Sequence, residues 1–238
     1  MPDTLEDLVM MQPPTPERPL LGSMVLVVED SRHACEALRL ICQRSGARIR
    51  RAESLASAHR HLRTYRPRLA VIDLGLPDGS GLELIAQLSS ADPRIDGIIA
   101  TSGDDGLRDA ALAAGADVFL SKPLASVSQF QKTALSLMPP GFCNVSVASG
   151  TFDEVTPDPI ALRDDLALAA ELLRVDPDAA TLEYVAGFLS GLAKCANTPQ
   201  VGALGDAVAA CAAKTPASHE LVQLALLIEE EASMFEPV

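Results

Sequence analysis

Short apolar segments alternate with amphipathic helical segments between residues 24 and 137, and this alternation constrains the fold most. MVLVVE at 24–29 is typical of a strand buried on both faces, and residues 32–44 follow with apolar positions at helical spacing. The pattern repeats, with strands expected at 47–52, 68–72, 96–101 and 116–120, and helices at 54–65, 81–90, 105–114 and 124–137. Five strands, each followed by a helix, predict an α/β fold with a doubly wound, five-stranded parallel sheet.

The rest of the chain has a different pattern. Residues 1–22 are a Pro-rich extension, and residues 139–158 are rich in Gly, Ser and Pro, which is typical of a linker. Prolines then open helical segments, a position that the first turn of a helix favours. We therefore predict an α/β domain over 23–138 and an all-α, four-helix domain over 159–238, with helices ending near Arg174, Ala196, Lys214 and Phe235.

Charge and composition exclude several classes of protein. The net charge is −13, of which residues 151–238 carry −11, with 4 basic and 15 acidic residues. Because DNA binding needs a basic face, we predict that the helical domain does not bind DNA. No apolar run approaches the ~18 residues of a membrane span. The acidic, Pro-rich start lacks the features of a secretory signal. The five cysteines are scattered and form no C-x-x-C, which indicates a reducing compartment: Cys35, Cys42, Cys143, Cys195 and Cys211. We therefore expect a cytoplasmic protein.

Polar residues gather at the carboxyl ends of the predicted strands, the edge where open parallel sheets bind ligands. Glu29 and Asp30 follow the first strand, and Asp73 follows the third. Three carboxylates in one place repel one another unless a cation lies among them, and hard oxygen ligands suit Mg²⁺. Thr101 and Lys122 end the next two strands, and a hydroxyl and an ammonium there would complete a cradle for a phosphoryl group.

The segments VLVVED, VIDLGLPDGSG, IIATSG and FLSKP resemble the receiver domain of bacterial two-component response regulators, over about residues 24–138. The resemblance implies a flavodoxin-like fold with Asp73 as the phosphoacceptor. It implies that Thr101 and Lys122 contact the phosphoryl group, and that Thr101 and Phe119 are the switch residues. It also implies Mg²⁺ as the cofactor, held by these four residues: Glu29, Asp30, Asp73 and the backbone carbonyl of Gly75.

The implied function is that of a response regulator in a phosphorelay, not an enzyme. Asp73 would accept a phosphoryl group from a sensor histidine kinase or a phosphotransfer protein, and the helical domain would signal by protein–protein interaction. The alternative is a DNA-binding transcriptional response regulator with an unrecognised output domain. Two other phosphate-handling folds do not fit, because no G-x-G-x-x-G follows the first strand and Leu74 and Gly75 follow Asp73, where a D-x-D pair is needed.

The helical domain carries no enzyme signature that we identify. It faintly resembles a histidine-phosphotransfer bundle, with Cys211 at the position of the phosphorylated histidine and Lys214 at that of the conserved lysine. Since cysteine cannot take that role, such a bundle would not transfer phosphoryl groups. An unrelated Ala-rich bundle is the favoured interpretation, serving as a homodimerisation module or as the site of an unknown protein partner.

Charge also suggests how the two domains meet. Residues 44–68 hold eight arginines, and the helical domain is strongly acidic. One hypothesis is that the bundle binds this arginine-rich face. The favoured alternative is that both faces are solvated, because exposed ion pairs contribute only ~0–1 kcal/mol each. The histidines on the predicted helices, His33, His59 and His61, are expected to be solvated as well.

Overall fold

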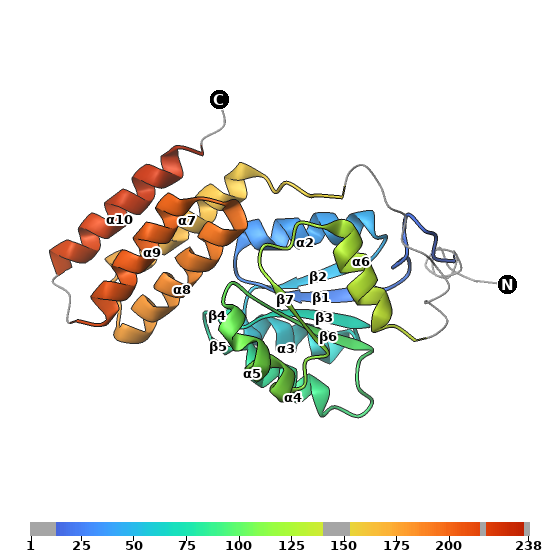
Figure 1. Cartoon of the computed structure of the whole chain (residues 1–238). Helices are drawn as coiled ribbons and strands as arrows, with labels where there is room; N and C mark the ends of the chain where they lie inside the picture. Colours follow the sequence, from blue (N-terminus) through green and yellow to red (C-terminus); the bar gives the residue numbers. More distant parts are fainter. Residues whose placement is uncertain (1–12, 140–152, 215–217, 236–238) are drawn as a thin grey trace.

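The computed structural model describes residues 13–139, 153–214 and 218–235. Five parallel strands form one sheet in the order β2-β1-β3-β6-β7, which confirms the predicted doubly wound topology (Figure 1). The strand order changes direction between β1 and β3, which lie side by side in the sheet. The helices that connect the strands therefore lie on both faces of the sheet. The strands are β1 (Met24–Val28), β2 (Arg48–Ala52), β3 (Leu69–Asp73), β6 (Gly97–Ser102) and β7 (Val118–Ser121).

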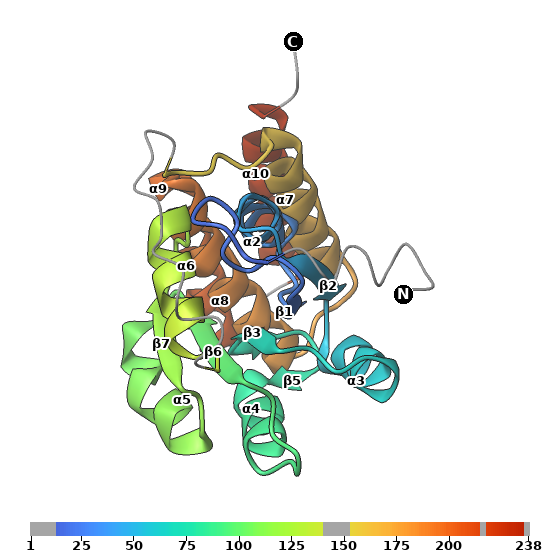
Figure 2. The same cartoon turned by 90° about the vertical axis from the view of Figure 1, so that its right-hand side faces the viewer.

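Helices cover both faces of the sheet, which explains why the strands are almost continuously apolar. Alternate strand residues point to opposite faces: Val25 and Val27 pack with α2 and α6, whereas Leu26 and Val28 pack with α3, α4 and α5. Figure 2 shows the same two layers seen from the side. The helices are α2 (Arg32–Arg44), α3 (Leu55–Thr64), α4 (Gly81–Ser89), α5 (Arg108–Ala114) and α6 (Val127–Ser136).

The chain after the sheet is helical, as predicted. In the described residues it forms α7 (Pro159–Arg174), α8 (Ala179–Ala196), α9 (Pro199–Ala212) and α10 (Ser218–Ser233). Each helix packs against its neighbours around one apolar core. Cys211 is partly buried against that core. None of the helices in the described ranges is long and apolar enough to cross a membrane.

Three local details differ from the predicted elements. Helix α8 begins at Ala179 because the Asp178 side chain accepts a hydrogen bond from the backbone N–H of Thr181, so Pro177 lies outside the helix. The segment 105–114 starts as a 3₁₀ turn, Asp105–Leu107, before α5 begins. A small hairpin that the sequence did not predict, β4 (Gly75–Leu76) with β5 (Gly79–Ser80), follows β3.

The described parts of the predicted N-terminal extension and of the predicted linker lie against the α/β domain. Leu20 is fully buried in its core, and its backbone N–H donates to the Ser45 carbonyl at 2.9 Å. Within the predicted linker, Glu154 pairs with Ser126 in an isolated β-bridge and Val155 is buried in the same core, so this part of it belongs to the α/β domain. Residues 1–12 and 140–152, which include Cys143, fall outside the described residues.

The helical bundle lies against the end of the sheet where the strands finish, beside α2 and the β4–β5 hairpin (Figure 1). The hypothesis that it binds the arginine-rich face is therefore wrong. Arginines of that face interact with residues of the α/β domain itself. Arg68 pairs with Asp96 at 2.8 Å, and the Arg50 guanidinium lies over the Tyr65 ring, 4.6 Å from its centroid. The contact that forms instead joins α7 to the start of α2, where Arg32 pairs with Asp164 at 2.8 Å.

Candidate phosphoacceptor site

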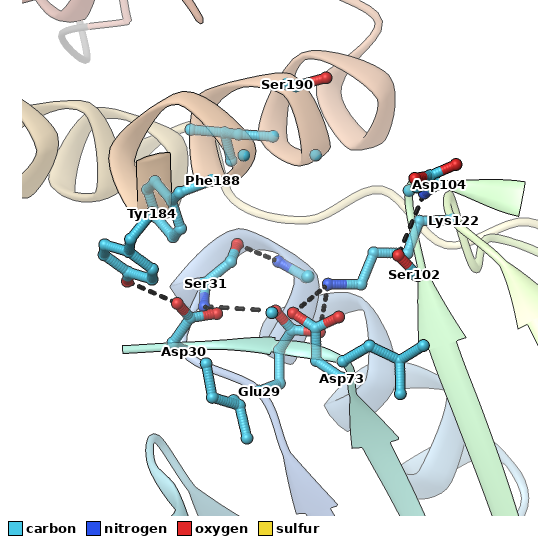
Figure 3. Close-up of a pocket in the computed structure, with 18 of the residues that line it drawn as sticks. Glu29, Asp30, Ser31, Asp73, Ser102, Asp104, Lys122, Tyr184, Phe188 and Ser190 are labelled. Atoms are coloured by element: carbon cyan, nitrogen blue, oxygen red, sulfur yellow. Dashed lines mark hydrogen bonds and ion pairs between the residues drawn. The ribbon is translucent and has the colours of Figure 1, made fainter. Parts of the chain in front are cut away.

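Three carboxylates meet at the carboxyl end of the sheet. Glu29 and Asp30 directly follow β1, and Asp73 ends the adjacent strand β3, so the parallel register places them side by side. One oxygen from each lies within 4.8 Å of the others, in the only such group found among the described residues (Figure 3). Glu29 is fully buried and Asp73 is 7% exposed. Acidic groups this close and this buried need compensating positive charge.

Lys122 supplies one such charge. Its Nζ lies 2.7 Å from Glu29 Oε2 and 3.0 Å from Asp73 Oδ2, and its side chain is only 8% exposed. Burial alone would lower the pKa of Lys122, but the attraction of Glu29 and Asp73 outweighs it and raises that pKa well above its ordinary value. The ammonium therefore stays charged at neutral pH. One cation among three carboxylates still leaves the site negative.

Asp30 is the carboxylate that lies away from Lys122 in Figure 3. Burial, together with repulsion by Asp73, raises the pKa of Asp30 to about 6, although a hydrogen bond from Tyr184 opposes the shift. The backbone N–H of Ser31 donates to Asp30 Oδ1 at 3.0 Å. The Tyr184 hydroxyl donates to Asp30 Oδ2 at 2.6 Å. Both oxygens of this carboxylate thus have a donor from the protein.

The other two predicted side chains, Thr101 and Phe119, are both buried. Thr101 is fully buried next to Asp73 in the sheet register, and its Oγ1 has no hydrogen-bond partner in the described part of the chain. An unpaired buried hydroxyl is costly, so this one is suited to a ligand that brings an acceptor. Phe119 is buried with the guanidinium of Arg108 over its ring at 4.8 Å.

Helix α8 lies across the opening of the site, which the sequence did not predict. A cavity of about 640 Å³ lies between α8 and the carboxyl end of the sheet. The carboxylates and Gly75 line it on one side, and Tyr184, Phe188 and Lys194 of α8 line it on the other (Figure 3). The Lys194 ammonium donates to the backbone carbonyl of Gly103, which follows β6. The cavity beside Asp73 thus lies beneath α8.

A second contact fastens the bundle to the start of α2. The buried carboxylate of Asp165 in α7 accepts hydrogen bonds from Ser31 Oγ at 2.8 Å, the Arg32 N–H at 2.8 Å and the His33 N–H at 3.0 Å. The two N–H groups are donors that a helix N-terminus leaves unpaired, and a negative charge is favourable there. His33 is itself buried, so the expectation that it is solvated is wrong. Burial lowers its pKa, against the attraction of Asp165.

Comparison with known proteins identifies the α/β part. The response regulator receiver domain family matches residues 25–133. This segment is a response regulator receiver domain. The recognition made from the sequence motifs is therefore confirmed for this part. The family match ends before α7 begins, so the helical domain lies outside it.

Two relatives extend the comparison. The KDP operon transcriptional regulatory protein KdpE of Escherichia coli K12 is 41% identical over 101 residues, which are 42% of this chain and 44% of KdpE. The virulence transcriptional regulatory protein PhoP of Salmonella typhimurium is 37% identical over 101 residues, which are 42% of this chain and 45% of PhoP. The match thus spans less than half the length of these relatives. Among solved structures, a putative response regulator from Chloroflexus aurantiacus is 24% identical, with a TM-score of 0.46, over 48% of this chain and 96% of that one.

Proposed function

We propose that this chain is a response regulator whose receiver domain accepts a phosphoryl group on Asp73 from a sensor histidine kinase or a phosphotransfer protein. The observation that supports this most is the grouping of Asp73 with Glu29, Asp30 and Lys122, with ligand oxygens within 4.8 Å and the ammonium 3.0 Å from Asp73. Burying a group of like charges is unfavourable for stability, which supports a functional role for this group.

In the proposed reaction, a carboxylate oxygen of Asp73 attacks the phosphorus of the donor. A P–O bond to Asp73 forms while the P–N bond to the donor histidine breaks, and the electron pair of that bond leaves with the imidazole. Thr101 would donate its unpaired hydroxyl to a phosphoryl oxygen. Lys122, already beside Asp73, would pair with the phosphoryl charge. Each residue thus stabilises negative charge that the transfer brings into the site.

The residues present fit a magnesium ion. Glu29, Asp30 and Asp73 offer carboxylate oxygens in one small volume, and Gly75 lines the same cavity. Hard oxygen ligands with room for water are what Mg²⁺ requires. When bound, the ion would neutralise the charge that Lys122 leaves uncompensated and the charge of the phosphoryl group. Glu29, Asp30, Asp73 and the carbonyl of Gly75 are the groups that would hold it.

Intact mass spectrometry tests the proposal. After incubation with acetyl phosphate and Mg²⁺, we expect the full-length protein to gain one phosphoryl group. The change Asp73→Asn, which keeps the size of the side chain but removes the nucleophile, should abolish the gain. An unmodified wild-type protein, or a variant that is modified equally, would contradict the proposal. Omitting Mg²⁺ should reduce the gain in the wild type.

For the output, we propose protein–protein interaction of the helical domain. The alternative is DNA binding, which the names of KdpE and PhoP as transcriptional regulators favour. Against it, residues 151–238 hold only 4 basic residues, too few to neutralise the phosphates of a duplex. An electrophoretic mobility assay with genomic DNA at low salt separates the two. We expect no shift, with or without acetyl phosphate, whereas a shift would favour the transcriptional alternative.

A further inference from the structure

This inference rests on the proposed function, because it concerns the magnesium site at Asp73. We infer that Tyr184 of the helical domain is an intramolecular competitor for that site: its hydroxyl holds Asp30 in the closed arrangement, so metal binding and closure of α8 over the site oppose each other. The helical domain would then set the metal affinity of its own receiver domain. The metal, in turn, would weaken the attachment of the helical domain.

The first argument is the geometry at Asp30. Tyr184 Oη lies 2.6 Å from Asp30 Oδ2, and the Ser31 N–H lies 3.0 Å from Oδ1. The Tyr184 bond is a short hydrogen bond to a carboxylate, the strong kind. Of the three acidic groups, Glu29 and Asp73 are paired with Lys122, so Asp30 is the carboxylate with the most to gain from a metal ion. Tyr184 occupies one of its oxygens.

The second argument is that α8 approaches the site closely and cannot move away without losing contacts. A Cβ atom built on Gly103 would lie 3.3 Å from the Cα of Gly191, so the helix and the loop after β6 are in direct contact. Lys194 holds the same loop through the carbonyl of Gly103. Asp165, one helix away, holds the start of α2. An ion coordinated at Asp30 Oδ2 competes for an oxygen that the Tyr184 hydroxyl occupies in this arrangement.

Thermodynamic linkage turns the competition into a measurable effect. If closure lowers the affinity for Mg²⁺ by some factor, then Mg²⁺ must weaken closure by the same factor. Removing only the hydroxyl of Tyr184 leaves the ring to pack beside Phe188, with the ring centroids 5.9 Å apart in the wild type. A hydrogen bond to a charged group corresponds to a factor of about ten or more in affinity. We therefore expect Tyr184→Phe to bind Mg²⁺ about tenfold more tightly.

The chain offers a matched control and a built-in probe, since it contains two tyrosines, Tyr65 and Tyr184, and no tryptophan. Tyr65 is 38% exposed, and its ring lies beside Arg50 and His61, within the receiver domain. Tyr65→Phe removes the same atom without touching the site. In that variant Tyr184 is the only tyrosine, and it dominates the emission because the chain has no tryptophan. Its emission should therefore change as Mg²⁺ is added, because the hydroxyl leaves the carboxylate.

Isothermal titration calorimetry of the full chain with Mg²⁺, on the wild type and both variants, is the test. We expect the wild type and Tyr65→Phe to bind equally and Tyr184→Phe to bind about tenfold more tightly. Equal binding by all three, weaker binding by Tyr184→Phe, or unchanged Tyr184 emission in Tyr65→Phe would overturn the inference and leave the proposed function intact. If none of the three binds Mg²⁺, the proposed magnesium site fails together with the inference.

Discussion

Replacing Lys122 with methionine is expected to lower the free energy of unfolding of the receiver domain by about 3–5 kcal/mol at neutral pH. The ammonium lies 2.7 Å from Glu29 and 3.0 Å from Asp73, and all three side chains are nearly inaccessible to water. Methionine keeps most of the length of the side chain but removes its charge. Two buried carboxylates would then lack a cation. Breaking a buried ion pair is strongly destabilising because the remaining charge is left buried without a partner.

Urea unfolding followed by circular dichroism measures this effect, with and without Mg²⁺. If the carboxylates form a metal site, Mg²⁺ should restore part of the lost stability in Lys122→Met and have a smaller effect on the wild type. Lys132→Met, which removes an exposed lysine on α6, is the control and should change stability by no more than about 0.5 kcal/mol. A Lys122 variant as stable as this control would show that the ion pairs contribute little.

Replacing Asp165 with alanine is expected to detach the helical bundle from the receiver domain. The carboxylate receives three hydrogen bonds from the start of α2, at 2.8, 2.8 and 3.0 Å. Its removal leaves two backbone N–H groups without their acceptor. We expect the closed arrangement to lose about 2–4 kcal/mol, since hydrogen bonds to a charged group contribute about 1.5–3 kcal/mol each and do not add fully.

Small-angle X-ray scattering detects the detachment as a larger radius of gyration for Asp165→Ala than for the wild type. Asp206→Ala is the matched control, because it removes an exposed aspartate from α9 of the same bundle. A radius of gyration that is the same in all three proteins would mean that other contacts keep the domains together. Faster tryptic cleavage near α7 in Asp165→Ala alone would support detachment independently.

The receiver fold and its acidic residues were predictable because their signals are local. Each strand is a short apolar run, and each candidate residue stands directly at a strand end, so topology alone brings Glu29 and Asp73 together. The contact between domains was not predictable in this way. Tyr184 and Lys194 lie on a helix whose apolar pattern indicates only a bundle, and nothing in that pattern identifies the partner surface.

Asp165 did carry a signal that the sequence analysis did not use. It lies on the buried stripe of α7 with Leu162, Leu166 and Ala169, where an unpaired carboxylate would be unfavourable. An acid at such a position indicates a donor from elsewhere in the chain. The hypothesis that the bundle binds the arginine-rich face was wrong for a related reason. It considered only net charge, whereas the bundle contacts the N-terminus of α2, where backbone N–H groups lack partners within the helix.

The most direct test of this account is to locate the phosphoryl group itself. Borohydride reduces an acyl phosphate to an alcohol, so treating the phosphorylated protein should convert the side chain of residue 73 alone. Tandem mass spectrometry of the tryptic peptide Leu69–Arg94 distinguishes Asp73 from the other acids in it, Asp78, Glu83 and Asp92. Our account predicts reduction at Asp73 only, in a reaction that requires both acetyl phosphate and Mg²⁺. Reduction at another acid, or none in a protein that has gained a phosphoryl group, would contradict it.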